Sequence, residues 1–131
     1  MDDTTYVTIG SGAPLPSSLT IDFGGLTMYY FGFYMGSPDT YNHITFAFSG
    51  ANGTQSFTGD QLIAPGNGDQ SIAEFVNFNS ASGFTQITMT SDQAAFETDN
   101  YAFAVPEPAS IILLGTFVLG ISSLIRRRRS A

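Results

Sequence analysis

The feature that most constrains this chain is its C-terminal segment, residues 105–131, which joins a proline-rich, an apolar and a basic stretch. Pro106-Glu107-Pro108 does not suit the interior of a strand or helix, because each proline lacks a backbone donor and restricts the residue before it. Residues 109–125 carry no charge, and ten of these seventeen positions are Leu, Ile, Val or Phe. All four Lys or Arg residues of the chain follow at once: Arg126, Arg127, Arg128 and Arg129. We therefore divide the chain into a domain at 1–104 and a tail at 105–131.

The apolar stretch of the tail has the length and composition of a transmembrane helix. Its seventeen residues would span about 26 Å as a helix, which is short for a hydrocarbon core of about 30 Å. The apolar side chains contribute on the order of −3 to −6 kcal/mol to insertion, and the arginines can extend to the headgroups. Because Lys and Arg mark the cytoplasmic end, we expect 109–125 to span the inner membrane with 1–104 outside it. The alternative, a buried core helix with a basic end, would normally have a polar face.

Pro-Glu-Pro, an apolar span and a C-terminal arginine cluster resemble the PEP-CTERM sorting signal of Gram-negative bacterial surface proteins. In that family a membrane-embedded exosortase recognises the tail and processes it near the Pro-Glu-Pro motif. The resemblance implies that Pro106, Glu107 and Pro108 are the recognition element, that 109–125 is a transient anchor, and that the arginines orient it. It also implies delivery to the cell surface or the exopolysaccharide matrix of a biofilm. The implied partners are the exosortase, the inner membrane and exopolysaccharide.

Export of this kind also requires a secretory signal peptide. The chain begins Met1-Asp2-Asp3-Thr4, without a basic or apolar run. We therefore expect that the N-terminus is truncated or that the start codon is misassigned. The third interpretation is an uncleaved C-terminal anchor that holds the protein permanently in the membrane.

The charge of the domain is entirely negative. Residues 1–104 contain no Lys or Arg and ten carboxylates: Asp2, Asp3, Asp22, Asp39, Asp60, Asp69, Glu74, Asp92, Glu97 and Asp99. Nucleic acid is therefore not an expected partner, because phosphate binding depends on Lys and Arg. The absence of cysteine excludes disulfides, thiolate metal sites and cysteine nucleophiles. The negative charge favours solubility or the binding of a cation.

The domain shows strand patterns from end to end, with turn residues between them. Residues 27–35 are apolar or aromatic on both alternating sets, which predicts a central strand covered on both faces. Asn52-Gly53 predicts a hairpin turn, and Tyr101, Phe103 and Val105 share a face of the last strand. The expected strands are 6–9, 19–23, 27–35, 43–49, 54–58, 72–79, 84–90 and 94–105, with 61–64 as a further short candidate.

With no amphipathic helix longer than one turn, this pattern predicts an all-β fold. The expected architecture is an antiparallel, jelly-roll-like β-sandwich followed by a single C-terminal transmembrane helix. A small closed barrel is the alternative. Three runs also resemble the small surface domains that precede PEP-CTERM tails: YYFGFYMGSPDTYNHITF (29–46), NGDQSIAEFVNF (67–78) and FETDNYAF (96–103). That resemblance implies a jelly-roll-like sandwich and a surface address, and it implies no reaction.

The sequence does not indicate catalysis, so we predict a non-enzymatic protein without catalytic residues. Glu97 and Asp99 would lie on one face of a strand about 7 Å apart, within the range of glycosidase carboxylates. Almost any alternating acidic pair meets that criterion, and the chain has no Trp to line a sugar cleft. His43 is the one histidine, and its place beside Asn42 at a strand start is more typical of an exposed or turn-capping residue.

Calcium is the metal that the residue types favour, because Ca²⁺ takes oxygen ligands from carboxylates, amides and carbonyls. The candidate ligands for a structural Ca²⁺ are Asp39 and Asn42 in one loop, and Glu97 and Asp99 in the last strand. The alternative is that these Asp and Asn residues, with Asn100, form turns by bonding to their own backbone.

Carbohydrate is the second candidate ligand. Exposed tyrosines could stack on the sugars of a matrix, and the candidates are Tyr34, Tyr41 and Tyr101. The alternative interpretation is that these rings fill or border the core.

Overall fold

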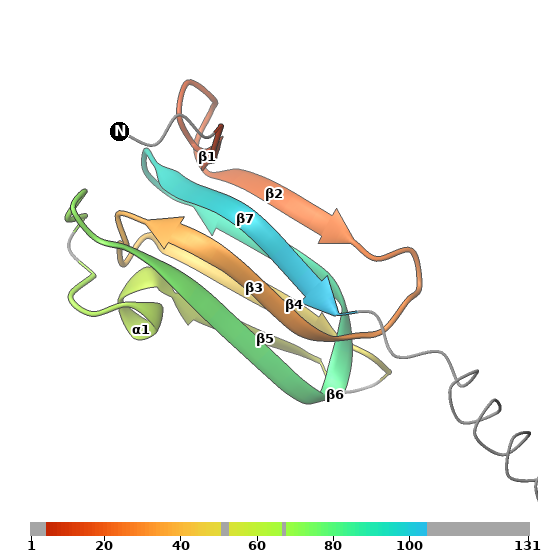
Figure 1. Cartoon of the computed structure of the whole chain (residues 1–131). Helices are drawn as coiled ribbons and strands as arrows, with labels where there is room; N and C mark the ends of the chain where they lie inside the picture. Colours follow the sequence, from red (N-terminus) through yellow and green to blue (C-terminus); the bar gives the residue numbers. More distant parts are fainter. Residues whose placement is uncertain (1–4, 51–52, 67, 105–131) are drawn as a thin grey trace, which may run out of the picture.

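Strands make up nearly all of the regular structure in this computed structural model, which describes residues 5–50, 53–66 and 68–104. All strand pairs are antiparallel, so the all-β prediction is confirmed (Figure 1). The elements are β1 (Val7–Ile9), β2 (Ser17–Asp22), β3 (Met28–Gly36), β4 (Asn42–Phe48), β5 (Thr54–Thr58), α1 (Gly59–Leu62), β6 (Ala73–Ser91) and β7 (Phe96–Ala104).

Strand β6 is the element that joins the two parts of the sheet. Its first half pairs with β3, and its second half lies between β2 and β4. The sequence predicts two strands at 72–79 and 84–90, but the structure has one strand of 19 residues that turns in its middle, where the ribbon passes from green to teal (Figure 1). Gly83 lies at this turn with φ +70°, and a Cβ there would be 2.3 Å from the methyl carbon of Thr27. Glycine therefore allows the strand to bend without ending.

The bend gives the domain a sandwich-like arrangement of two groups of strands. One group follows the order β1-β7-β3-β6, and the other contains the second half of β6 with β2, β4 and β5. β1 and β5 stand at opposite ends of the pairing order and do not pair with each other. Within residues 5–104 as described, the sheet is therefore not the closed barrel that the sequence left as an alternative.

Aromatic rings from both groups meet in the core. Phe46 of β4 packs against Phe31 of β3, with ring centroids 6.4 Å apart, and against Phe78 of β6 at 4.6 Å. The remaining fully buried apolar side chains come from β3, β4, β6 and β7. They follow the period of two of a strand, except that the register of β6 shifts by one residue between Phe84 and Ile87: Phe33, Met35, Ile44, Phe84, Ile87, Met89 and Phe96.

Strand β3 is fully covered on its core face and only partly covered on the other, which corrects the prediction of two covered faces. Tyr29 and Tyr34 are 45% and 43% exposed, whereas Phe31 and Phe33 are fully buried. The prediction was wrong because aromatic residues occupy both faces of this strand. Aromatic residues favour strands in general, so their presence does not show whether a face is covered or exposed to solvent.

The expected strand at 61–64 is also wrong, because the helix α1 occupies its first half and the second half is not a strand. Gln61 lies three residues after Thr58, and its side chain accepts the backbone N–H of Thr58 at 2.9 Å. This contact is half of a capping box, which favours a helical turn directly after β5. Gly59 is buried, and a Cβ on it would be 2.3 Å from the Asp39 carbonyl oxygen.

The last strand contains a bulge that sets which side chains face the groove described below. Asn100 has φ +52°, and the register between β3 and β7 shifts at this point. The extra residue lets Thr98 and Tyr101 both face inward while Glu97 and Asp99 face outward. Tyr101 stacks on Phe31, and Phe103 contacts Phe23 at 5.6 Å, so these two rings share a face as expected. Val105 lies outside the described residues.

The tail predictions fall outside the part of the chain that the structure describes. This applies to Pro106, Glu107 and Pro108, to the expected helix at 109–125, and to the arginines at 126–129. Within residues 5–104, leaving out 51–52 and 67, there is no helix with the length and hydropathy needed to cross a membrane.

Candidate functional site

A groove of about 470 Å³ lies on the outer face of the β1, β7 and β3 group. The register of the sheet places its carboxylates, because Asp99 is opposite Tyr34 and Glu97 is opposite both Gly36 and Thr8. Side chains two residues apart on a strand share a face, so Glu97 and Asp99 enter the groove together. The residues that line it include Tyr6, Tyr34, Glu97, Asp99 and Asn100, and we call these five the groove residues.

Tyrosines line the groove on both sides of β7, because Tyr6 directly precedes β1 and Tyr34 lies on β3. Tyr34 is exposed, and Tyr6, one residue before β1, is 57% exposed. Tyr34 makes an edge contact with Phe75 at 5.4 Å, which holds its ring in place. Phe75 in turn lies over Gly32, where a Cβ would be 2.6 Å from the Phe75 ring. Glycine at position 32 therefore lets the aromatic layer lie directly on the backbone of the sheet.

The carboxylates of the groove lie on β7, next to its bulge. The Asn100 backbone N–H donates to Asp99 Oδ1 at 2.7 Å, so the backbone conformation of Asn100 also orients Asp99. Glu97 has room because its neighbour is Gly36, at which a Cβ would be 3.5 Å from Glu97 Oε2. No Lys or Arg occurs before residue 126, so the described part of the chain supplies no basic side chain to neutralise these carboxylates.

The four candidate calcium ligands do not form one cluster. Glu97 and Asp99 line the groove, whereas Asp39 lies in the turn between β3 and β4 and Asn42 is the first residue of β4. Asn42 is 1% exposed, with its Oδ1 3.0 Å from Ser91 Oγ and its amide donating to the Ser37 carbonyl at 3.4 Å. In the described ranges, no three His, Cys, Asp or Glu side chains gather closely enough to hold a metal ion.

Asp39 is instead engaged with a neighbouring tyrosine. A hydrogen bond to the buried Asp39 carboxylate, with some burial and the repulsion of its charge, raises the pKa of Tyr41 to about 12. The Asn42 backbone N–H also donates to the Asp39 carbonyl at 3.2 Å. The Asn42 side chain donates to the Ser37 carbonyl, and the Asp99 side chain accepts the backbone N–H of Asn100. Both are hydrogen bonds between a side chain and nearby backbone, as the turn interpretation expects.

Of the three tyrosines that the sequence suggested for sugar binding, one lines the groove. Tyr34 does so, Tyr41 is bonded to Asp39, and Tyr101 faces the core. The Tyr101 hydroxyl is hydrogen-bonded to Thr98, and burial raises its pKa. Tyr6 was not foreseen, because it reaches the groove only through the pairing of β1 with the distant β7.

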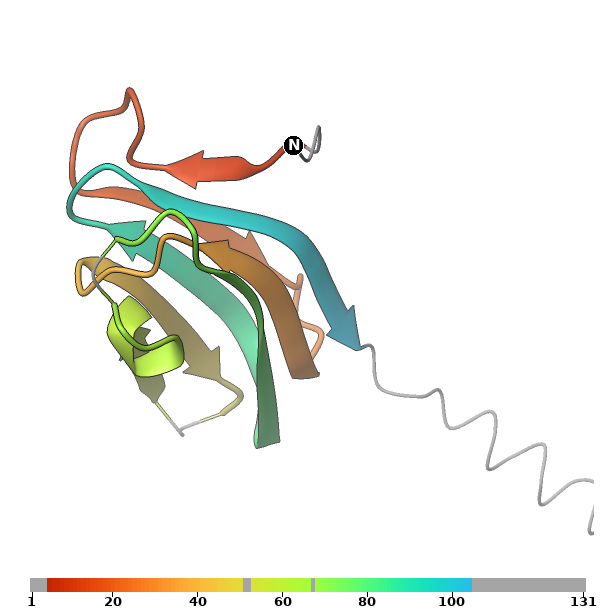
Figure 2. The same ribbon diagram turned by 60° about the vertical axis from the view of Figure 1, so that its left-hand side comes forward.

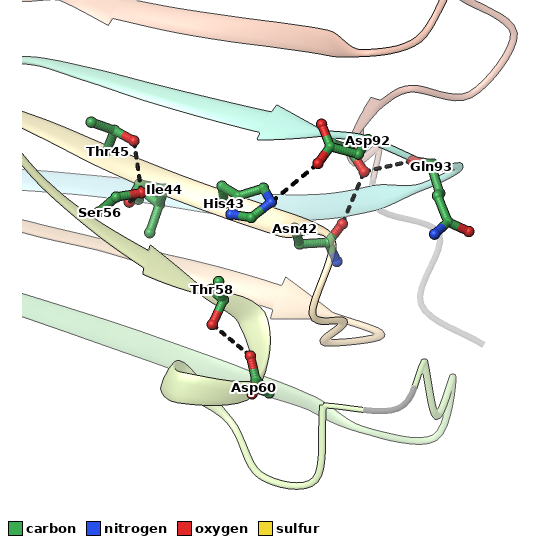
Figure 3. Close-up of polar contacts among 10 residues, drawn as sticks. Asn42, His43, Ile44, Thr45, Ser56, Thr58, Asp60, Asp92 and Gln93 are labelled. Carbon is green, nitrogen blue, oxygen red and sulfur yellow. Dashed lines mark hydrogen bonds and ion pairs between the residues drawn. The ribbon is translucent and has the colours of Figure 1, made fainter.

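The single histidine belongs to a set of polar contacts around β4 (Figure 3). His43 Nε2 lies 3.4 Å from Asp92 Oδ2 in a surface pair. The hydroxyl of the adjacent Ser91 is directed to Asn42 and to the Gln93 carbonyl, at 3.0 and 2.5 Å. On the other side of β4, Thr45 and Ser56 are 2.9 Å apart. These contacts tie β4 to its neighbours, and Ser91 is not aligned as a nucleophile on His43.

The fold and the groove define an all-β domain with an acidic and aromatic surface site. No protein-family model matches the chain, and a search of curated proteins finds no significant match.

Proposed function

We propose that this chain is an exported, non-enzymatic surface or matrix protein of the PEP-CTERM class. The observation that carries the proposal is the order of segments at its C-terminus: Pro-Glu-Pro, a charge-free apolar span of seventeen residues, and four arginines. In this reading an exosortase of the inner membrane processes the tail near Pro106, Glu107 and Pro108, and the domain is then released to the cell surface or the extracellular matrix.

The end of the folded domain supports this reading. β7 ends at Ala104, whose partner in the sheet is Tyr30, and Pro106 follows two residues later. A segment with two prolines cannot extend the pairing of β7 with β3 through regular backbone hydrogen bonds. Such a segment between a domain and a membrane span is accessible to a processing enzyme, which a paired strand is not.

The role that we propose for the domain is association with exopolysaccharide, on a jelly-roll-like sandwich. The groove supports this role, because it combines exposed tyrosine rings with hydrogen-bonding groups on one open face. The alternative function is a permanently anchored sandwich that binds calcium or carbohydrate and keeps its tail.

Substitution of the Pro-Glu-Pro motif tests the sorting proposal. We expect Pro106→Ala, Glu107→Ala and Pro108→Ala together to lower the amount of extracellular protein at least about tenfold, equivalent to losing about 1.4 kcal/mol of recognition. The measurement is quantitative blotting of membrane and extracellular fractions from the native host. Ser110→Ala, which leaves the motif intact, is the matched control.

Release of the triple variant at the level of the wild type would contradict the proposal. Retention of both the triple variant and the Ser110→Ala control in the membrane would also contradict it, because the motif would then have no specific role. The expected pattern is retention of the triple variant and release of the control.

A further inference from the structure

We propose that the groove residues bind a polysaccharide chain that carries no acidic groups. The inference rests on the matrix role proposed above and deepens it by assigning the site and the ligand class. The groove is lined by residues of β3 and β7 and by Tyr6, which directly precedes β1. β1 is the edge strand of this group (Figure 2). A polymer can therefore enter and leave it without passing through a closed cavity.

The groove offers partners both for the apolar C–H face of a sugar ring and for its hydroxyl groups. The exposed rings of Tyr6 and Tyr34 offer flat apolar surface to the C–H face of a sugar, and their hydroxyls can exchange hydrogen bonds with it. Glu97 and Asp99 accept hydrogen bonds from sugar hydroxyls, and such charge-assisted bonds are stronger than neutral ones. The Asn100 amide both donates and accepts. A volume of about 470 Å³ is within the range of small-ligand sites.

Contacts within the protein fix two of the groove residues. Asp99 is fixed by the Asn100 backbone at 2.7 Å, and Tyr34 is held against Phe75 at 5.4 Å. Groups that are ordered beforehand lose less conformational entropy on binding. The bulge at Asn100 therefore fixes Asp99, and the packing of Phe75 over Gly32 fixes Tyr34, before a ligand binds.

Charge decides which class of polymer the groove accepts. Every carboxylate before the tail lies in a region without Lys or Arg, so uronate-rich polysaccharides and nucleic acids are repelled. Neutral sugars are not repelled, and amino sugars are attracted by Glu97 and Asp99. The groove contains two carboxylates. In the described residues, no third His, Cys, Asp or Glu side chain lies close enough to complete a metal site with them. We therefore assign direct recognition of the sugar rather than recognition through a bound cation.

The groove lies away from the end of β7. The groove contacts β7 at Glu97 to Asn100, and β7 continues to Ala104. Ala104 is four positions after Asn100, which corresponds to roughly 13 Å along the strand. The site is thus displaced from the point at which the tail begins.

The test uses the full-length chain in a zwitterionic detergent without a sugar headgroup. It is applied to a glycan array that contains neutral, amino-sugar and uronate polymers of many linkages, and to the exopolysaccharide isolated from the host. We expect binding to neutral or amino-sugar polymers and none to uronate polymers. Tyr34→Ala should weaken binding at least about tenfold, as loss of one well-buried aromatic contact predicts, whereas Tyr34→Phe should retain most of it.

Tyr29→Ala is the matched control, because Tyr29 is similarly exposed on β3 but does not line the groove. It should bind as the wild type does, and the thermal unfolding of all variants is compared to show that they fold. Preferential binding to uronates, loss of binding on chelation of calcium, or no glycan bound by the folded wild type would overturn the proposal. So would equal losses in Tyr34→Ala and Tyr29→Ala.

The two proposals fail separately. A chain that binds glycans in vitro but is never released from the membrane would refute sorting and leave the groove assignment standing. A chain that is cut and released but binds no glycan would refute the groove assignment alone.

Discussion

At the residue scale, the turn between β3 and β4 shows why an acidic residue need not be a metal ligand. Asp39 is buried and is bonded to Tyr41 and the backbone of its own turn. Glu97 and Asp99 have the same chemistry but face an open groove. The residues next to Asp39 in the sequence are similar in composition to those next to Glu97 and Asp99. The difference in role therefore depends on whether the carboxylate faces the core or the groove.

The Asp39–Tyr41 contact predicts a pH effect at the alkaline end. The pKa of Tyr41 rises from 10.0 to about 12, so the folded state holds this proton more tightly than the unfolded state. The resulting stabilisation is fully present below pH 10 and is lost as the pH rises through 12. A spectroscopic titration of phenolate should show one group near 12 that is missing in Tyr41→Phe, and Asp39→Asn should bring it back toward 10. Titration of Tyr41 near 10 in the wild type would contradict this account.

At the scale of elements, the bend in β6 is the feature on which both groups of strands depend. Gly83→Ala should destabilise the domain, because alanine is strained at φ +70° and its Cβ would meet Thr27 at 2.3 Å. Gly24→Ala is the matched control, since Gly24 has φ +63° and open space around it. We expect about 1–2 kcal/mol for the conformation alone in the control and about 1–3 kcal/mol more at position 83.

Urea unfolding of the full-length variants in detergent, followed by near-ultraviolet circular dichroism, measures this difference. Equal stability of the two variants would show that the close approach at the bend does not constrain the fold.

The strands could be predicted from the sequence because their signal is local. Alternation of Ile44, Thr45 and Phe46 places β4 correctly, and the same period of two puts Glu97 and Asp99 on one face. The bend at Gly83 and the turn at α1 were missed for a different reason. A glycine after a polar run is compatible with a break or a bend, and a four-residue helix is too short to show periodicity.

The grouping of the site residues could be predicted only in part. Glu97 and Asp99 are neighbours in sequence, whereas Tyr34 and Tyr6 meet them through pairings of β3 and β1 with β7. The pairing of β3 with β7 depends on the position of the bulge at Asn100. That position in turn depends on how Thr98 and Tyr101 pack against the core. The expected grouping with Asp39 and Asn42 assumed that the loop and the last strand converge, and the turn places these side chains elsewhere.

At the scale of the whole molecule, the chain combines a negatively charged domain with a tail that holds all of its positive charge. The separation agrees with the two roles that we propose, in which the tail orients the chain in the membrane and the domain presents its groove to the exterior. Removal of the tail would change the net charge of the product from −7 to a more negative value, because four arginines leave with at most one carboxylate. The released domain would then be more soluble and more strongly selective against acidic polymers.

The intact mass of the protein recovered from its host tests the central claim most directly. The host is fractionated into membrane and extracellular material, and the mass of each species is measured without digestion. We predict an extracellular species whose C-terminus lies at or near residues 106–108. A full-length species that ends at Ala131 and stays with the membrane would contradict sorting by cleavage, and the protein would then be a permanently anchored sandwich.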